Sequence, residues 1–122
     1  MFIGEKIDVT DTAELSACLD ESFANLELMG VECAIDITVK NSIYTRDAIR
    51  VYDFFEAVTE AAMDNLSFVW LKARSLEDTV IFYLQAESNT DLSALSALAD
   101  SCAYEEGVWR FSMRIKKAGE QA

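Results

Sequence analysis

The chain has 122 residues, is 52% hydrophobic and contains no proline, which fits one domain with a real core and excludes a disordered or loop-rich protein. Its formal net charge of −12 makes nucleic acid and anionic membrane surfaces poor partners. Charged residues interrupt every apolar stretch before the roughly 18 residues that a membrane span needs. The first residues lack the pattern of a signal peptide. We therefore expect a single cytoplasmic domain over residues 1–122.

The first third of the chain predicts a helix and then a strand. Residues 1–10 are short and mixed, typical of a strand or an arm. Asp11 and Glu14 form a capping signal for a helix that Gly30 is placed to end. Residues 31–39 alternate between apolar and polar, which predicts a half-buried strand. The apolar side chains of the helix recur at steps of three and four residues: Leu15, Cys18, Leu19, Phe23, Leu26 and Met29.

The remaining elements follow a loop at 41–46. A long helix is expected over 47–66, with a wide apolar stripe that suits a helix lying flat on a sheet. Two strands, 68–74 and 79–86, are joined by a hairpin at 75–78. Thr90 or Asp91 then caps a second helix, a turn follows at 105–107, and a half-buried strand runs over 108–116 before a polar, frayed tail. The stripe of the long helix is Val51, Phe55, Val58, Ala62 and Leu66, widened by Ile49, Phe54 and Ala61, and the second helix presents Leu92, Leu95, Leu98 and Cys102.

This order of elements, each strand with one apolar face, predicts a two-layer α/β sandwich in which helices cover one face of a mixed sheet. The order of strands and helices from Val31 to Lys116 also fits a ferredoxin-like module, which is the alternative architecture. The three cysteines, Cys18, Cys33 and Cys102, are odd in number and widely spaced. We expect them to be reduced and unpaired, as buried thiols.

The chemistry open to the chain is limited, because it has no histidine and no phosphate-binding glycine motif. The one constellation of interest is three carboxylates spaced by four residues on the long helix: Glu56, Glu60 and Asp64. Such a row repels itself, so it either flanks a cation or forms an acidic solvent-facing surface. On spacing alone, an acidic solvent-facing surface is favoured over a cation site.

The segment Phe54-Phe55-Glu56-Ala57-Val58-Thr59-Glu60-Ala61-Ala62-Met63-Asp64-Asn65 resembles the helix that carries the N box in ATP-binding domains of sensor histidine kinases. These domains belong to the superfamily shared with gyrase, Hsp90 and MutL. The resemblance covers roughly residues 12–116 in the order of elements, and implies that family's fold, Mg-ATP as cofactor and histidine kinase chemistry. It assigns Glu60 to the catalytic glutamate and Asp64 to the magnesium-holding asparagine, with Asn65 one residue late.

The resemblance fails at two points that matter for nucleotide binding. The family reads adenine with an aspartate or asparagine that is followed by glycine at the end of the strand after the hairpin. Here Ala86 stands at the position of the family's aspartate. Glu87, the remaining candidate for contact with the cofactor, stands one residue after that position. No glycine lies between Gly30 and Gly107, so a glycine-rich phosphate loop is missing.

These losses predict that nucleotide binding is weak or absent and that the isolated domain is inactive as a kinase. The resemblance also implies protein partners: the domain would act in signal transduction through contacts with the rest of a kinase or with a response regulator. The alternative function is a ferredoxin-like module that binds a small ligand or a protein without catalysis.

Overall fold

The computed structural model describes residues 9–38 and 40–118, so the expectation for residues 1–8 and most of the expected tail lie outside the described residues. The elements are β1 (Val9–Asp11), α1 (Thr12–Leu28), β2 (Glu32–Asp36), β3 (Ser42–Tyr44), α2 (Thr45–Ala62), η1 (Met63–Asn65), β4 (Phe68–Ser75), β5 (Thr79–Glu87), η2 (Ser93–Leu98), β6 (Ser101–Glu105) and β7 (Val108–Lys116). The letter η marks a short 3-10 helix.

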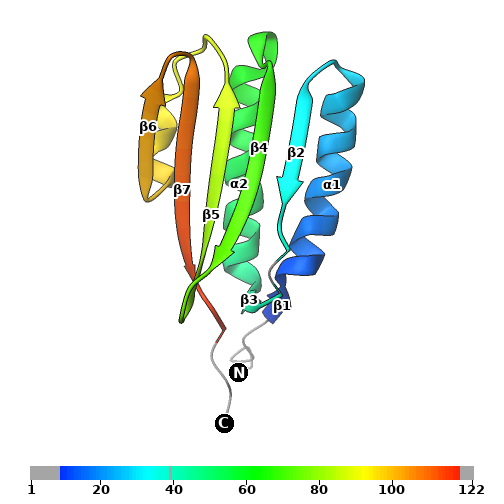
Figure 1. Ribbon diagram of the computed structural model, residues 1–122, viewed down its shortest axis with the longest axis vertical. Helices are drawn as coiled ribbons and strands as arrows, with labels where there is room; N and C mark the ends of the chain where they lie inside the picture. Colours follow the sequence, from blue (N-terminus) through cyan, green and yellow to red (C-terminus); the bar gives the residue numbers. More distant parts are fainter. Residues whose placement is uncertain (1–8, 39, 119–122) are drawn as a thin grey trace, which may run out of the picture.

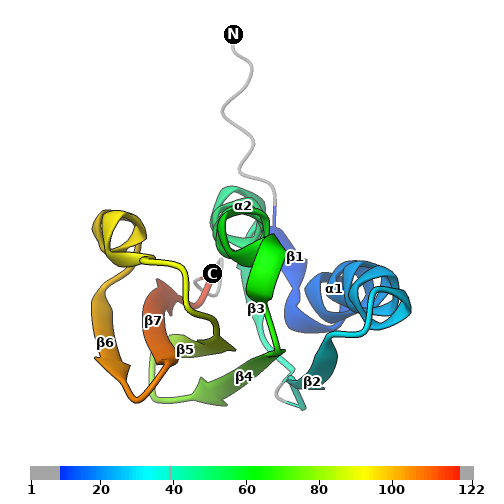
Figure 2. The same ribbon diagram turned by 90° about the horizontal axis from the view of Figure 1, so that it is seen from above.

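Five strands form one mixed sheet in the order β2-β4-β5-β7-β6, and only β2 and β4 run parallel. Among the described residues, the helices lie on one face of this sheet and no helix lies on the other (Figures 1 and 2). The predicted two-layer α/β sandwich is confirmed. The ferredoxin-like alternative is wrong, because that fold separates its parallel strands by another strand, whereas β2 and β4 are direct neighbours.

The first helix begins and ends where the sequence predicts. The Asp11 side chain caps α1 by accepting a hydrogen bond from the Glu14 N–H at 2.9 Å. Gly30 follows the helix with a φ of 91°, a left-handed conformation that glycine adopts without strain. Leu15, Leu19, Phe23 and Leu26 are buried against the sheet as expected. Cys18 and Met29 are exposed, so their placement in the buried stripe was wrong.

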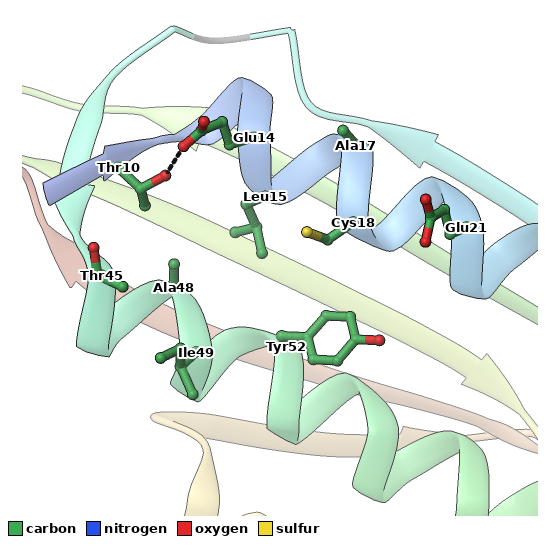
Figure 3. Close-up of a pocket in the computed structure, with 10 residues that line it drawn as sticks. All are labelled: Thr10, Glu14, Leu15, Ala17, Cys18, Glu21, Thr45, Ala48, Ile49 and Tyr52. Carbon is green, nitrogen blue, oxygen red and sulfur yellow. Dashed lines mark hydrogen bonds between the residues drawn. The ribbon is translucent and has the colours of Figure 1, made fainter.

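The core lies between the helices and the covered face of the sheet. Val51, Phe55, Val58 and Ala62 of α2 and Leu66 beyond it are buried, as is Phe54, whose ring meets that of Phe111 edge-on at 5.1 Å. Ile49 and Ala61 are exposed, which corrects the expected width of the stripe. Ile49 faces the region between α1 and α2 rather than the sheet (Figure 3).

The short strand β3 was not predicted, whereas β1 begins in the segment that was expected to be a strand or an arm. Residues 42–44 of the expected loop form β3, which pairs antiparallel with β1. As a result α2 begins at Thr45 and not at residue 47, and it ends at Ala62 before tightening into η1. At the other end, Lys117 forms a β-bridge with Ile43, and the Ala118 N–H donates to the Ser42 carbonyl at 2.8 Å. The expectation of a frayed tail is therefore wrong for Lys117.

The helix expected after Asp91 is the largest error. Only residues 93–98 are helical, as the 3-10 turn η2, and Cys102 lies on the edge strand β6 opposite Phe111 of β7. Pairing with β7 satisfies backbone groups that a helix would have bonded internally. The β6–β7 turn does occur as predicted, with Glu106 and Gly107 at positive φ. No helix among the described residues is long and apolar enough to cross a membrane.

Candidate functional site

The three carboxylates of the long helix do not form one row in the structure. Glu60 is exposed on α2, and Asp64 is exposed on η1, beyond the end of the regular helix. Glu56 is half-buried and accepts a hydrogen bond from the Ser22 hydroxyl of α1 at 3.4 Å. Ser22 also bonds the Tyr52 hydroxyl at 2.9 Å. Within residues 9–38 and 40–118, no three His, Cys, Asp or Glu side chains gather closely enough to hold a metal ion.

Asn65 joins the end of α2 to the end of β5. Its Oδ1 accepts hydrogen bonds from the Ser88 hydroxyl, from the Asn89 N–H at 3.0 Å and from the Thr90 hydroxyl at 3.2 Å. The Ser88 Oγ in turn accepts from the Thr90 N–H at 3.0 Å. Ser88 is buried, with 3% of its surface exposed. The Oδ1 of Asn65, at the end of the N-box segment, is therefore already occupied by three protein donors.

The two candidates at the end of β5 lie on opposite faces of the sheet. Ala86 is fully buried on the face that the helices cover, and it pairs with Trp109 of β7. Glu87 is half-buried, and the alternation of the strand turns its side chain to the opposite face, away from Glu60 and Asp64. The structure thus brings Asn65 to the β5 end but does not bring Glu87 to the same side.

Trp109 occupies the covered face beside Ala86. Its indole lies 4.6 Å from the Tyr104 ring and 6.3 Å from the Phe111 ring, measured between centroids. The indole is 8% exposed, and its Nε1–H has no acceptor among the described residues. Large aromatic side chains therefore fill the space next to the position where the resemblance implies adenine.

Four backbone N–H groups in the segment after β5 are already paired, those of Ser88, Asn89, Thr90 and Ser93. The Ser88 N–H donates to the Gly107 carbonyl at 3.0 Å, and the Ser93 N–H donates to the Asp91 carboxylate at 2.9 Å. Hydrogen bonds from Ser93, first from its side chain and second from its backbone N–H, lower the pKa of Asp91. The Asn89 and Thr90 N–H groups are bonded within the Asn65 network described above. A phosphate approaching this segment would meet donors that are already used.

A depression of about 470 Å³ lies between α2 and η2. It is on the side of α2 that also carries Glu60, since Asp53 and Glu60 are seven residues apart and share a helix face. Arg50 is the one cation in its wall, where Asp53 and Asp100 also lie. One guanidinium between two carboxylates gives no net positive charge for a triphosphate.

A larger groove, about 670 Å³, runs between α1 and α2 on the side away from the sheet (Figure 3). Leu15, Ala48, Ile49 and Tyr52 give it an apolar lining, and Figure 3 draws Cys18 among them. Glu14 also lines the groove and accepts a hydrogen bond from the Thr10 hydroxyl. The residues of the N box are not among those that line this groove.

All three cysteines are free. Burial, with the nearby Glu27 carboxylate as a smaller cause, raises the pKa of the Cys33 thiol to about 11. Burial also raises the pKa of Cys102. Both thiols are therefore neutral at physiological pH, and neither is a nucleophile of the activated kind.

Ser88 and Trp109 were not singled out from the sequence. Ser88 follows Ala86 by two residues, so both side chains lie on the same side of the strand. This alternation is the sequence signal that could have identified Ser88 as a buried residue of the site. Nothing local marks Trp109, because its place beside Ala86 depends on the register of β5 with β7.

No model of a known protein family matches the sequence, and no curated protein matches it either. Solved structures do match. The histidine kinase AdeS of Acinetobacter baumannii is 12% identical with a TM-score of 0.68, over 93% of this chain and 68% of that one. The catalytic domain of histidine kinase ThkA is 10% identical with a TM-score of 0.69, over 94% and 99%. ThkA in complex with the response regulator TrrA also matches, over 92% of this chain and 42% of that one, with 10% identity and a TM-score of 0.65. The chain therefore has the fold of histidine kinase catalytic domains, as the N-box resemblance implied.

Proposed function

We propose that this chain is a histidine-kinase-type ATP-binding domain in which nucleotide binding is weak or lost, and that it acts in signal transduction through contacts with other proteins. The observation that carries the proposal is the Asn65 network, which ties the end of α2 to the end of β5. In this fold that junction is where the resemblance implies a nucleotide. A ligand would have to break these bonds or approach without using the groups they occupy.

Three further features support the loss of affinity. Ala86 offers no acceptor to an adenine amino group, and a missing partner for a buried hydrogen bond costs about 1–3 kcal/mol. Trp109 crowds the same face. The formal net charge of −12 disfavours a polyanion unless magnesium offsets it. Since about 1.4 kcal/mol is a factor of ten, these terms together weaken binding by several orders of magnitude.

Asp64 is the residue that would retain magnesium if any nucleotide bound. It is exposed and carries a carboxylate, a hard oxygen ligand of the kind that magnesium prefers. Glu60, one turn earlier, is exposed on α2 and is the candidate for the catalytic glutamate. Neither has a described hydrogen-bond partner that positions it, which fits a site no longer held in a working geometry.

A protein partner follows from the same proposal. The similar kinase ThkA has been solved with the response regulator TrrA. We infer that the partner here is a response regulator or another part of a kinase, and that the contact takes place in the cytoplasm.

Titration calorimetry of Mg-ATP into the purified chain tests the proposal. We expect no saturable binding below about 1 mM, a threshold that corresponds to roughly −4 kcal/mol. A dissociation constant in the low micromolar range would overturn the claim of lost binding. In that case Glu60→Ala and Asp64→Ala locate the site: weaker binding in both places it at the end of α2, and unchanged affinity in both removes the N-box assignment.

A further inference from the structure

The centre of the sheet face opposite the helices gathers cations, although the chain as a whole is acidic. Side chains of β4 and β7 alternate between the two faces of the sheet. Figure 2 shows that α1 and α2 lie on one face only, so every second side chain is directed away from them. We call the outward side of β4, β5 and β7 the basic face. Its cations are Lys72, Arg74, Arg110, Arg114 and Lys116, half of the ten lysines and arginines in a chain of net charge −12, and Glu87 of β5 is a carboxylate on the same side.

Apolar side chains stand between these cations. Strand register places Ile81 of β5 between Arg74 and Arg114, and its side chain is only 7% exposed although it points outward. The alkyl stems of long basic side chains cover apolar surface in this way. Trp70 is 47% exposed, and its ring lies 5.2 Å from that of Phe68. The basic face therefore combines charge with an accessible aromatic surface.

Within the described residues, four of the five cations of the basic face make no close ion pair, although Asp36 of β2 lies opposite Lys72 in strand register. The one ion pair within residues 9–38 and 40–118 joins Arg110 to Glu105 at 3.4 Å, and both partners are exposed. The other four cations have no ion pair in that part of the chain. Strand β5 separates β4 from β7, so the cations of these two strands are about 10 Å apart across the sheet, while neighbours along one strand are about 7 Å apart. Both separations lie within about one Debye length, so the like charges repel one another. An external group of negative charges would relieve this repulsion.

We propose that the basic face docks an acidic, amphipathic segment of a partner protein, whose carboxylates pair with the cations while an apolar side chain rests on Trp70. A short segment suits the face better than a polyanion or a bilayer does. Glu32 and Asp36 of β2 border the face on one side and Glu105 of β6 on the other, and an extended anionic surface would meet them. This inference rests on the sheet alone and holds whether or not the domain binds nucleotide.

The probes for the test are a fluorescent peptide of repeated Glu-Glu-Leu, a labelled oligothymidylate and vesicles that contain phosphatidylglycerol. Anisotropy gives the affinity for the first two and co-sedimentation for the third, and backbone NMR shifts of the whole chain map the peptide. Lys72→Glu and Lys40→Glu change the net charge equally, but Lys40 lies outside the sheet, after β2. Thermal melting verifies that each variant is folded, and Lys72→Gln replaces Lys72→Glu if that variant melts early.

We expect the peptide to shift residues of β4, β5 and β7, and Lys72→Glu to weaken binding about tenfold more than Lys40→Glu does at low salt. Trp70→Ala should weaken binding several-fold with an unchanged dependence on salt. Equal losses in Lys72→Glu and Lys40→Glu would overturn the proposal, as would shifts confined to α1 and α2. Tighter binding of the oligothymidylate or the vesicles than of the peptide would assign the face to a different class of partner and would also overturn it.

Discussion

Replacing Asn65 with alanine removes the acceptor that holds the segment after β5 to the end of α2. Three donors lose their partner, but they do not lose equally. The Asn89 N–H and the Thr90 hydroxyl belong to residues that water reaches, whereas Ser88 is 3% exposed and its hydroxyl has no other acceptor described. An unsatisfied buried donor costs about 1–3 kcal/mol. We therefore expect Asn65→Ala to lower the free energy of unfolding by about 2 kcal/mol, most of it through Ser88.

Urea denaturation followed by circular dichroism measures this change, with Asn89→Ala as the matched control. Asn89 donates to Asn65 through its backbone N–H, which the substitution keeps, and its side chain has no hydrogen bond in the described structure. The control should therefore lie within about 0.5 kcal/mol of the parent. In the double variant Asn65→Ala with Ser88→Ala both partners are gone, and the combined loss should be smaller than the sum of the single losses. Equal stability of Asn65→Ala and Asn89→Ala would refute the reasoning.

Three other outcomes are expected. Phe55→Ala, at a side chain that is 1% exposed, should cost about 3–5 kcal/mol in urea denaturation, whereas Ile49→Ala at 54% exposure should cost less than about 0.5 kcal/mol. Alkylation at pH 8 followed by mass spectrometry should label the exposed Cys18 first. The rate of alkylation at Cys33 should rise only as the pH approaches the Cys33 pKa of about 11, because the thiolate is the reactive form. Equal rates at Cys18 and Cys33 would contradict this. Asp11→Ala should lower stability by about 1 kcal/mol through loss of the α1 cap, while Asp20→Ala on the same helix should not.

Much of the fold could be predicted because its strongest signals are local. The cap at Asp11 and the left-handed Gly30 mark the ends of α1 within a few residues of sequence. Alternation with one apolar face identified β4, β5 and β7. The buried residues of β4 and β7 follow a period of two, and β5 departs from it at the outward but buried Ile81. These elements form the centre of the sheet and its first covering helix, so the architecture followed from them.

The errors occur where a distant part of the chain decides the local structure. Leu92, Leu95, Leu98 and Cys102 are spaced as on a helix, but Cys102 belongs to a strand because β7 offers it a pairing edge. The short strand β3 likewise exists through its partners β1 and Lys117. In both cases long-range pairing outweighs local propensity.

The candidate site was predicted only in outline. The position of Asn65 beside the N-box residues was found by resemblance, but its bonds to residues 88–90 cross 23 to 25 positions of sequence. No local pattern encodes them. The row of Glu56, Glu60 and Asp64 was broken for a similar reason, since Ser22 of another helix bonds Glu56 and a 3-10 turn displaces Asp64 from the regular helix.

The strand β3 brings the two ends of the described chain together. Val9 pairs with Tyr44 on one side of β3, and Lys117 bridges Ile43. Two strand spacings of about 4.8 Å each place these ends roughly 10 Å apart, and Figure 1 shows them at the same end of the molecule. A short flexible linker between residues 9 and 118 can span that gap, so residues 9–118 suit circular permutation with new ends opened at the exposed Glu106 of the β6–β7 turn. The same geometry suits insertion into a surface loop of another protein. The two points where the loop joins the inserted domain would then lie about two strand spacings apart.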